Sequence, residues 1–206
     1  MRHKDNRPEY IIFAGVNGAG KSTFYHTRSW TSEKADIKMP RVNSDEILRD
    51  AQGDWASAAS QAQAAKEAVK KARRLLDERR TFNQETTLSG RSSLLRIEEA
   101  MRRGYRTQMF YIGIQSPTLA QKRIAHRSEM GGHSIDEEVV LRRYRESLKN
   151  LSKAVRVCDE VVVLDNTIDF VEVVRWENGI VSWVGDLKRR GQWLFDAMKD
   201  ETIWGS

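Results

Sequence analysis

The feature that most constrains the fold is a glycine-rich segment directly behind an apolar run near the start of the chain. Residues 10–14, Tyr-Ile-Ile-Phe-Ala, have the continuous apolar character of a strand buried on both faces, as in a parallel sheet. Residues 15–22 then fit the pattern G-x-x-x-x-G-K-[ST], and the residues behind them open a helix. Strand, glycine loop and helix start are the context that this pattern requires, so the stretch predicts a phosphate-binding loop.

The predicted loop has the chemistry to hold a nucleoside triphosphate. Its glycines let the backbone curl until N–H groups point at phosphate oxygens, and the following helix adds the positive end of its dipole. We expect Lys21 to reach the β and γ phosphates and the Ser22 hydroxyl to ligate Mg²⁺. The residues expected to contact ATP or GTP here are Gly15, Asn17, Gly18, Ala19, Gly20, Lys21, Ser22 and Thr23.

Strand-like and helix-like segments alternate along the chain. The further predicted strands are a short one ending at 42–43 and the runs at 81–88, 105–114 and 160–166. The predicted helices are 20–30, one starting near residue 45, and 55–80, 89–104, 116–131 and 134–156. This alternation predicts an α/β fold with a doubly wound, mostly parallel sheet of the P-loop kinase type.

The end of the chain departs from this alternation. Residues 170–184 predict a hairpin with Asn178-Gly179 at its turn, and residues 191–199 predict a short helix. We therefore expect a single domain over residues 1–206, with a core at 9–167 and an appendage at 168–206.

Charge and cysteine content narrow the class of protein. The formal net charge of +6 suits anionic ligands, nucleotides among them. The single cysteine, Cys158, excludes an internal disulfide and a multi-cysteine zinc site. No apolar run approaches the roughly 18 residues of a membrane span, and no apolar stretch follows the basic start as in a secretion signal. We expect a cytoplasmic protein that does not engage a membrane.

Polar side chains follow the second and third predicted strands, where a parallel sheet collects its ligands. Asn43 and Asp45 follow the second strand, and Glu85 and Thr86 follow the third. Two carboxylates near a triphosphate could deprotonate an attacking hydroxyl or hold the metal. For Asp45 the alternative is a helix N-cap, which is a common position for aspartate.

Arginines gather further along the chain. Arg123 and Arg127 are four residues apart and share a helix face, and Arg142 and Arg143 lie on the next helix. The double glycine at 131–132 could hinge the segment between them, so the arginines could close over the phosphates during phosphoryl transfer. Solvated surface is the alternative for each arginine. Asp165, at the end of the last buried strand, fits a loose Walker B pattern or borders the adenine pocket.

Four segments in this order resemble the zeta toxins in their short form, which are P-loop kinases of toxin–antitoxin systems. They are "GVNGAGKST", "VNSDEI", "FNQETT" and "RIAHRSEMGGHSID…RRY", and the resemblance covers roughly residues 10–166. It implies transfer of the ATP γ-phosphate to a hydroxyl of a UDP-linked amino sugar such as UDP-N-acetylglucosamine, and an antitoxin protein as a partner.

The resemblance also implies roles for residues of this chain. Lys21 and Ser22 would hold the phosphates and magnesium, and Asp45 would take the proton of the substrate hydroxyl. Asn43, Glu85 and Thr86 would lie in the substrate pocket. Arg127 with Arg142 or Arg143 would serve the phosphates, and Arg123 is a further candidate for contact with the nucleotide.

Other functions fit the same loop. A polynucleotide 5′-hydroxyl kinase would suit the positive charge, but the chain has no basic stripe with interleaved aromatics, which argues against nucleic acid as a partner. An antibiotic phosphotransferase would use the same chemistry with another pocket. A nucleotide-gated binding protein with little catalysis is the alternative from a different class, although a pure switch has no need for the two acids.

Overall fold

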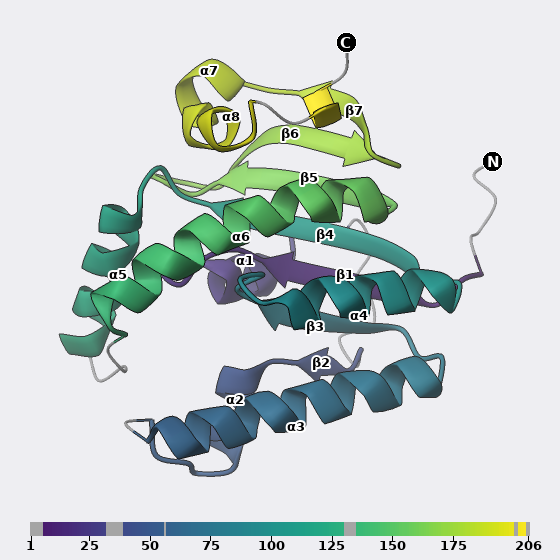
Figure 1. The fold of residues 1–206 in the computed structure, drawn as a ribbon, viewed down its shortest axis with the longest axis vertical. Coiled ribbons are helices and arrows are strands. Elements are labelled where there is room, and N and C mark those ends of the chain that lie inside the picture. The colour runs from purple at the N-terminus through teal and green to yellow at the C-terminus, as the bar shows by residue number, and fades with distance from the viewer. Residues whose placement is uncertain (1–5, 32–38, 56, 130–134, 200–201, 205–206) are drawn as a thin grey trace.

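The computed structural model describes residues 6–31, 39–55, 57–129, 135–199 and 202–204. Its centre is a seven-stranded sheet in the order β2-β3-β1-β4-β5-β6-β7 (Figure 1). The strands are β1 Glu9–Ala14, β2 Arg41–Val42, β3 Phe82–Thr86, β4 Arg106–Gly113, β5 Glu160–Asp165, β6 Val171–Glu177 and β7 Ile180–Val184. The helices are α1 Lys21–Thr27, α2 Ser44–Asp50, α3 Ala58–Asp77, α4 Arg91–Arg102, α5 Pro117–Glu129, α6 Glu137–Val157, α7 Leu187–Arg190 and α8 Gln192–Met198, followed by a 3₁₀ turn, Thr202–Trp204.

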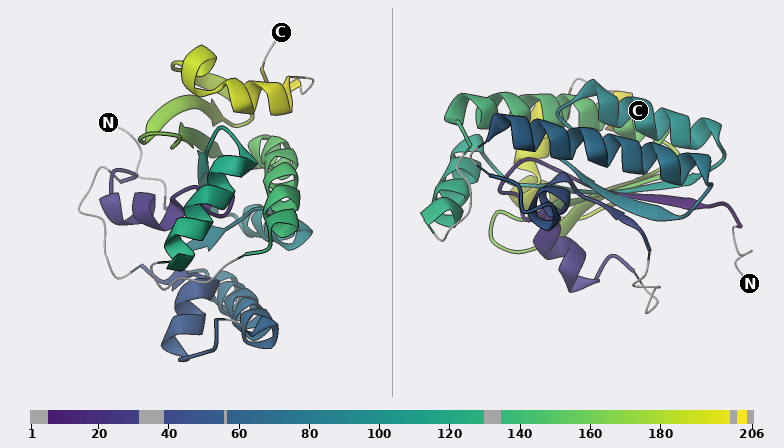
Figure 2. Two further views of the ribbon diagram at one scale, coloured as in Figure 1. Left: turned by 90° about the vertical axis from the view of Figure 1, so that its left-hand side faces the viewer. Right: turned by 90° about the horizontal axis from the view of Figure 1, so that it is seen from below.

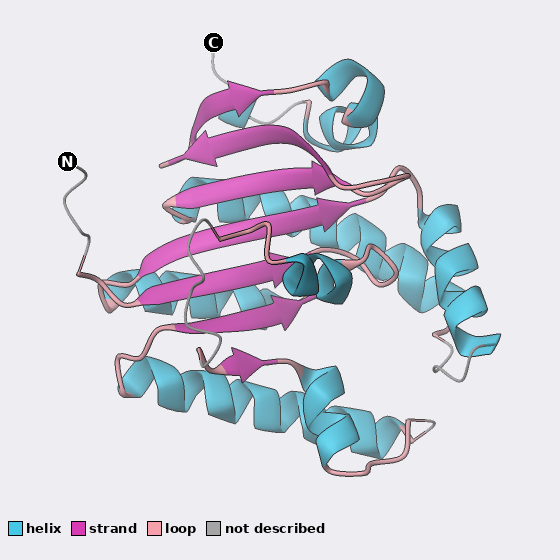
Figure 3. Ribbon diagram, turned by 180° about the vertical axis from the view of Figure 1, so that it is seen from behind, coloured by secondary structure: helices cyan, strands magenta, loops and turns pink. Residues whose placement is uncertain are grey.

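The strand directions confirm the predicted α/β fold. The five strands from β2 to β5 pair in parallel, whereas β6 and β7 join the edge as an antiparallel hairpin. Helices α3, α4 and α6 cover one face of the sheet, and the short helix α1 lies against the other (Figures 2 and 3). In the described part of the chain, no helix has both the length and the apolar character needed to cross a membrane.

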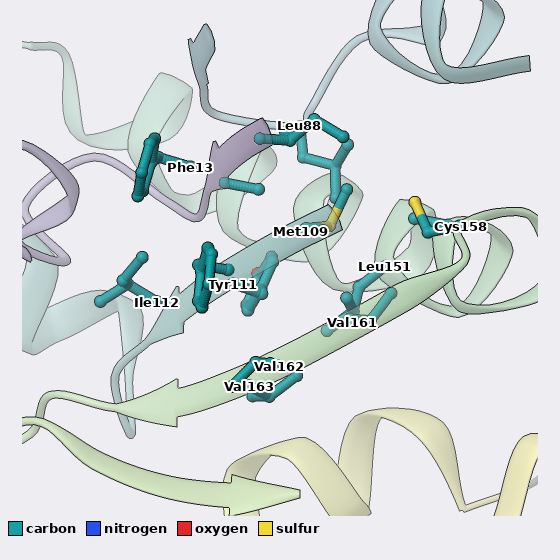
Figure 4. Packing of buried hydrophobic residues seen from close by; sticks show 14 of the residues in the cluster. Phe13, Leu88, Met109, Tyr111, Ile112, Leu151, Cys158, Val161, Val162 and Val163 are labelled. Carbon is teal, nitrogen blue, oxygen red and sulfur yellow. The ribbon is translucent and has the colours of Figure 1, made fainter. Parts of the chain in front are cut away.

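The core lies between the central strands and the helices on either face. Every residue of β1 from Tyr10 to Ala14 is buried, as expected of a strand in the middle of a parallel sheet. Phe13 stacks on Phe110 of the neighbouring strand with ring centroids 5.8 Å apart. On the other side, Leu151 of α6 packs in the same cluster as Val161 (Figure 4).

The single cysteine belongs to this core. Cys158 ends helix α6 and is 2% exposed. Burial raises the pKa of its thiol to about 12. The thiol is therefore protonated at neutral pH and behaves as a small apolar side chain.

The C-terminal hairpin has the predicted turn. Asn178 and Gly179 have φ angles of +51° and +78°, as a two-residue turn of type I′ requires. Trp176 of β6 is fully buried, and its indole Nε1 donates a hydrogen bond to the Ile203 carbonyl oxygen at 2.8 Å. The last turn of the chain is thus fastened to the hairpin.

Asp165, the candidate for a Walker B carboxylate, is instead part of the contact between the sheet and this C-terminal region. The side chain is 1% exposed, and it accepts hydrogen bonds from Arg190 Nε at 2.9 Å and from Trp193 Nε1 at 3.0 Å. It also accepts hydrogen bonds from the backbone and hydroxyl of Thr167. Because its oxygens are engaged in this way, Asp165 has a structural role.

Arg190→Ala should lower the free energy of unfolding by about 1.5–3 kcal/mol, because it removes a charge-assisted partner from a buried carboxylate. Urea unfolding followed by tryptophan fluorescence measures this loss. Arg189→Ala is the matched control, since the Arg189 side chain is 85% exposed, and it should change stability by less than about 0.5 kcal/mol. Equal losses in the two variants would show that the Asp165 contact contributes nothing specific.

Candidate active site

Two glycines of the loop after β1 lie where no larger residue fits. Gly15 has a φ of +137°, and a Cβ there would lie 2.1 Å from the Ile112 carbonyl oxygen of β4. Gly20 has a φ of +94°, and a Cβ there would lie 2.5 Å from Nδ2 of Asn166. Gly15 is therefore required by its positive φ and by the close approach of the β4 backbone, and Gly20 by its positive φ.

Side chains from distant parts of the chain fasten this loop. Asn166, just after β5, donates a hydrogen bond from Nδ2 to the Ala19 carbonyl oxygen at 2.8 Å. Arg123 of α5 donates to the Gly18 carbonyl oxygen at 3.4 Å and to the Thr167 carbonyl oxygen at 3.1 Å. The loop conformation is thus held from both β5 and α5.

Lys21 begins α1 and is 8% exposed. Its Nζ donates a hydrogen bond to the Val16 carbonyl oxygen at 3.0 Å and lies 4.0 Å from Oε1 of Glu85. Burial lowers the pKa of Lys21, and the negative charges of Glu85 and Asp45 act against this. The lysine is therefore held over the loop, within electrostatic range of both predicted carboxylates.

Glu85, at the end of β3, is the centre of a polar network, and its side chain is 10% exposed. Ser22 Oγ donates to its carboxylate at 2.9 and 3.0 Å, Arg41 donates to Oε2 at 2.7 Å, and Asn43 Nδ2 donates to Oε2 at 3.0 Å. The hydroxyl expected to ligate magnesium is thus next to a carboxylate. Oxygen ligands of this kind are those that Mg²⁺ prefers.

Arg41, which the sequence analysis missed, orients this carboxylate. It also donates hydrogen bonds to Glu46 at 2.7 Å and to Asn83 at 3.1 Å, and its guanidinium lies 3.7 Å from the centre of the Tyr25 ring. These contacts leave the guanidinium one orientation. The alternation of side chains along a strand could have indicated this role of Arg41. Arg41 stands two residues before Asn43 and so lies on the same face of the strand.

The N-cap of α2 is Asn43, so the alternative that made Asp45 the cap is wrong. Asn43 Oδ1 accepts a hydrogen bond from the Asp45 backbone N–H at 2.8 Å. The Asp45 carboxylate has no hydrogen bond or ion pair to another described residue, and the residue is exposed on the wall of a cleft. Burial lowers the pKa values of Lys21 and Arg143, and the negative charge of Asp45 opposes that shift in both. Among the described residues, Asp45 is therefore an unpaired carboxylate, and it lines the same cleft as Asn17 and Lys21 of the phosphate loop.

Of the predicted arginines, Arg123 and Arg143 donate hydrogen bonds to the loop, whereas Arg127 and Arg142 have no such contact among the described residues. Arg143 of α6 donates a hydrogen bond to Asn17 Oδ1 at 3.1 Å, and burial lowers its pKa. Arg127 is exposed on α5, but its positive charge contributes to the lowered pKa of Lys21. Arg142 is exposed and does not line the cleft. The double glycine at 131–132 lies outside the described residues.

The cleft beside the loop has a volume of about 650 Å³. Its walls come from the phosphate loop, the start of α2, the alanine-rich face of α3, the end of β3 and the first turns of α4 and α6. Thr86, predicted in the substrate pocket, lines this cleft, and its hydroxyl lies 3.0 Å from that of Ser93. The cleft therefore joins the phosphate loop to a second region that is large enough for a small molecule.

Solved structures with similar folds support this architecture. A chain of the PezAT chromosomal toxin–antitoxin system of Streptococcus pneumoniae has a TM-score of 0.58 and 16% identity, over 82% of this chain and 72% of that one. A chain of the AvrRxo1-ORF1:-ORF2 complex with ATP has a TM-score of 0.66 and 14% identity, over 91% of this chain and 64% of that one. These likenesses show that the fold, a mostly parallel sheet with helices, is shared with both solved chains.

Sequence comparison shows the family. An uncharacterized protein of Haemophilus influenzae is 31% identical over 134 residues, which are 65% of this chain and 91% of that protein. The family described as AAA domain matches residues 11–151, which is more than half of the chain and runs from β1 into α6, the stretch that carries the loop and the cleft. The chain belongs to this AAA domain family.

Proposed function

We propose that the protein is a phosphotransferase that moves the γ-phosphate of ATP to a hydroxyl of a small acceptor in the cleft. One observation carries the proposal: the free carboxylate of Asp45 and the fastened phosphate loop with Lys21 line the same cleft. The first supplies a base for an alcohol, and the second is the phosphate-binding element of P-loop proteins.

The proposed reaction assigns each group a step. The acceptor hydroxyl attacks the γ-phosphorus and loses its proton to Asp45, while the bond from phosphorus to the bridging oxygen breaks and ADP leaves with the electron pair. Lys21 binds the phosphate oxygens. Arg123 and Arg143, which donate hydrogen bonds to the loop, stabilise the negative charge on the group in transfer, and the positive charge of Arg127 on α5 adds to theirs.

Magnesium fits the oxygen donors at the loop. Ser22 Oγ and the Glu85 carboxylate, 2.9 Å apart, would hold the ion, directly or through water. When bound, Mg²⁺ neutralises charge on the phosphates. We therefore revise the expected role of Glu85 from substrate binding to metal binding, with Arg41 and Asn43 as residues that position its carboxylate.

Glu85→Gln should lower the affinity of the ADP-bound protein for divalent metal about 10- to 100-fold, as removal of a ligand or its orienting partner usually does. Titration with Mn²⁺ followed by electron paramagnetic resonance measures this affinity directly. Glu138→Gln, a change on the exposed start of α6, is the control. Unchanged metal affinity in Glu85→Gln would show that Glu85 does not bind the metal and would favour its role in substrate binding.

UDP-N-acetylglucosamine is the acceptor that we propose, on the resemblance to zeta toxins. The fold shared with a chain of a toxin–antitoxin system supports this, and it also supports an antitoxin as a partner. Incubation with γ-labelled ATP, Mg²⁺ and UDP-N-acetylglucosamine should give a labelled sugar nucleotide. Release of label only as inorganic phosphate would favour a simple ATPase or a nucleotide-gated switch.

We also propose that residues 9–167 and 168–206 form one domain. The observation in favour is that β6 and β7 continue the same sheet and that Arg190 pairs with Asp165 at the end of β5. Limited proteolysis should then leave the C-terminal region protected as long as the core is folded.

A further inference from the structure

The half-buried arginines of the described residues form two groups. Those that pair with a carboxylate within 3.3 Å are Arg41, Arg103, Arg106, Arg175 and Arg190. Those with no carboxylate partner among the described residues are Arg96, Arg123 and Arg143. A partly desolvated cation without a counter-charge is unfavourable, which makes the second group a sign of anionic ligands.

The positions of these three arginines differ. Arg123 and Arg143 donate hydrogen bonds to the phosphate loop, and the proposed function gives them the ATP phosphates as anions. Arg96 lies on α4 and lines the same cleft, next to Gln84 of β3. ATP bound to the loop would therefore provide the missing negative charge for Arg123 and Arg143. It would leave Arg96 without an anionic partner, which points to a second anion in the cleft.

The contacts of Arg96 hold it in place without neutralising it. Its NH1 donates to Oε1 of Gln84 at 3.1 Å, and the same oxygen accepts a hydrogen bond from the Tyr10 hydroxyl at 2.6 Å. Gln84 is 6% exposed and anchored in β3, so the guanidinium is tied to a neutral, buried oxygen. The remaining N–H donors of the planar fork suit the paired oxygens of a phosphate or a carboxylate.

We infer that Arg96 is an anion-binding residue for the acceptor, so that the acceptor is a hydroxyl compound that carries a phosphate or carboxylate group. This rests on the proposed function for the statement that the second ligand is an acceptor. Of the acceptors considered above, a sugar nucleotide and a polynucleotide carry the required anion, whereas an antibiotic without an acidic group does not.

The test is isothermal titration of the whole protein with UDP, with glucuronate and with uncharged N-acetylglucosamine, each with and without saturating ADP. At least one anionic probe should bind to the ADP-loaded protein, and Arg96→Gln should weaken that binding about 10- to 100-fold. Binding of UDP alone would assign a phosphate group, and binding of glucuronate alone would assign a carboxylate. The affinity for ADP should be unchanged in Arg96→Gln.

Two further variants keep the test sharp. Arg91→Gln removes the same charge from an exposed position on the same helix and should leave all affinities unchanged. Arg96→Lys keeps the charge without the fork, should bind the anion less well than wild type, and replaces Arg96→Gln if glutamine prevents folding. Equal anion binding by wild type and Arg96→Gln, or no binding of either anion to wild type, would overturn the inference. Failure of wild type to bind ADP would instead defeat the proposed function, and the comparison without ADP would still decide the role of Arg96.

Discussion

Lys21→Ala is expected to weaken ATP binding at least about 10- to 100-fold, because the variant loses charge-assisted hydrogen bonds to the phosphates. Every activity that depends on the nucleotide should fall together, whichever acceptor is supplied. Titration calorimetry with ATP and with ADP measures the effect. The loss should be larger for ATP, since the γ-phosphate adds charge near the lysine.

Lys66→Ala is the control for this experiment. Lys66 is exposed on α3 and does not line the cleft, so its removal changes the net charge equally without touching the site. If Lys21→Ala and Lys66→Ala bind ATP equally well, the loop after β1 is not a triphosphate site and the proposed chemistry fails with it.

Asp45→Asn is expected to reduce phosphoryl transfer by about 10²–10⁴-fold, the usual contribution of a general base. ADP affinity should stay within a few fold of wild type, because Asp45 lies on the cleft wall and not on the loop. The fold should also be retained. The N-cap of α2 is Asn43, and it bonds the backbone N–H of residue 45, which the substitution leaves intact.

The matched control for Asp45→Asn is Asp50→Asn, at the exposed end of the same helix. Rates of transfer and ADP affinities measured side by side on both variants separate a catalytic effect from a change in net charge. If Asp45→Asn transfers phosphate at the wild-type rate, the Asp45 carboxylate is not the general base, even if the nucleotide still binds.

Local sequence signals predicted most of the fold. The apolar run at residues 10–14, the glycine pattern behind it and the alternation of strands and helices are local features, and each strand they predicted lies in the sheet. The turn at Asn178-Gly179 was predictable for the same reason, because two positive φ angles leave few choices of residue. The candidate acids after β2 and β3 also lie near the loop, as the rule for parallel sheets predicts.

The polar pairings of the site were harder to predict, since they join residues far apart in the chain. Asn166 fastens a loop that ends more than a hundred residues earlier, and Arg41 orients a carboxylate of another strand. Asp165 shows the opposite difficulty, a residue that fits a functional pattern but has a structural role. Its strand-end position fits a metal-binding acid, but Arg190 and Trp193 from the C-terminal region occupy the carboxylate. Only the tertiary structure distinguishes a free carboxylate such as Asp45 from an engaged one.

Mass spectrometry of a bacterial metabolite extract incubated with the protein, ATP and Mg²⁺ tests directly whether the protein phosphorylates a small acceptor. Wild type should convert an acidic metabolite to a species heavier by one phosphate, and Asp45→Asn should do so about 10²–10⁴-fold more slowly. Consumption of ATP at the same rate with and without the extract, with no phosphorylated metabolite formed, would contradict the proposed function.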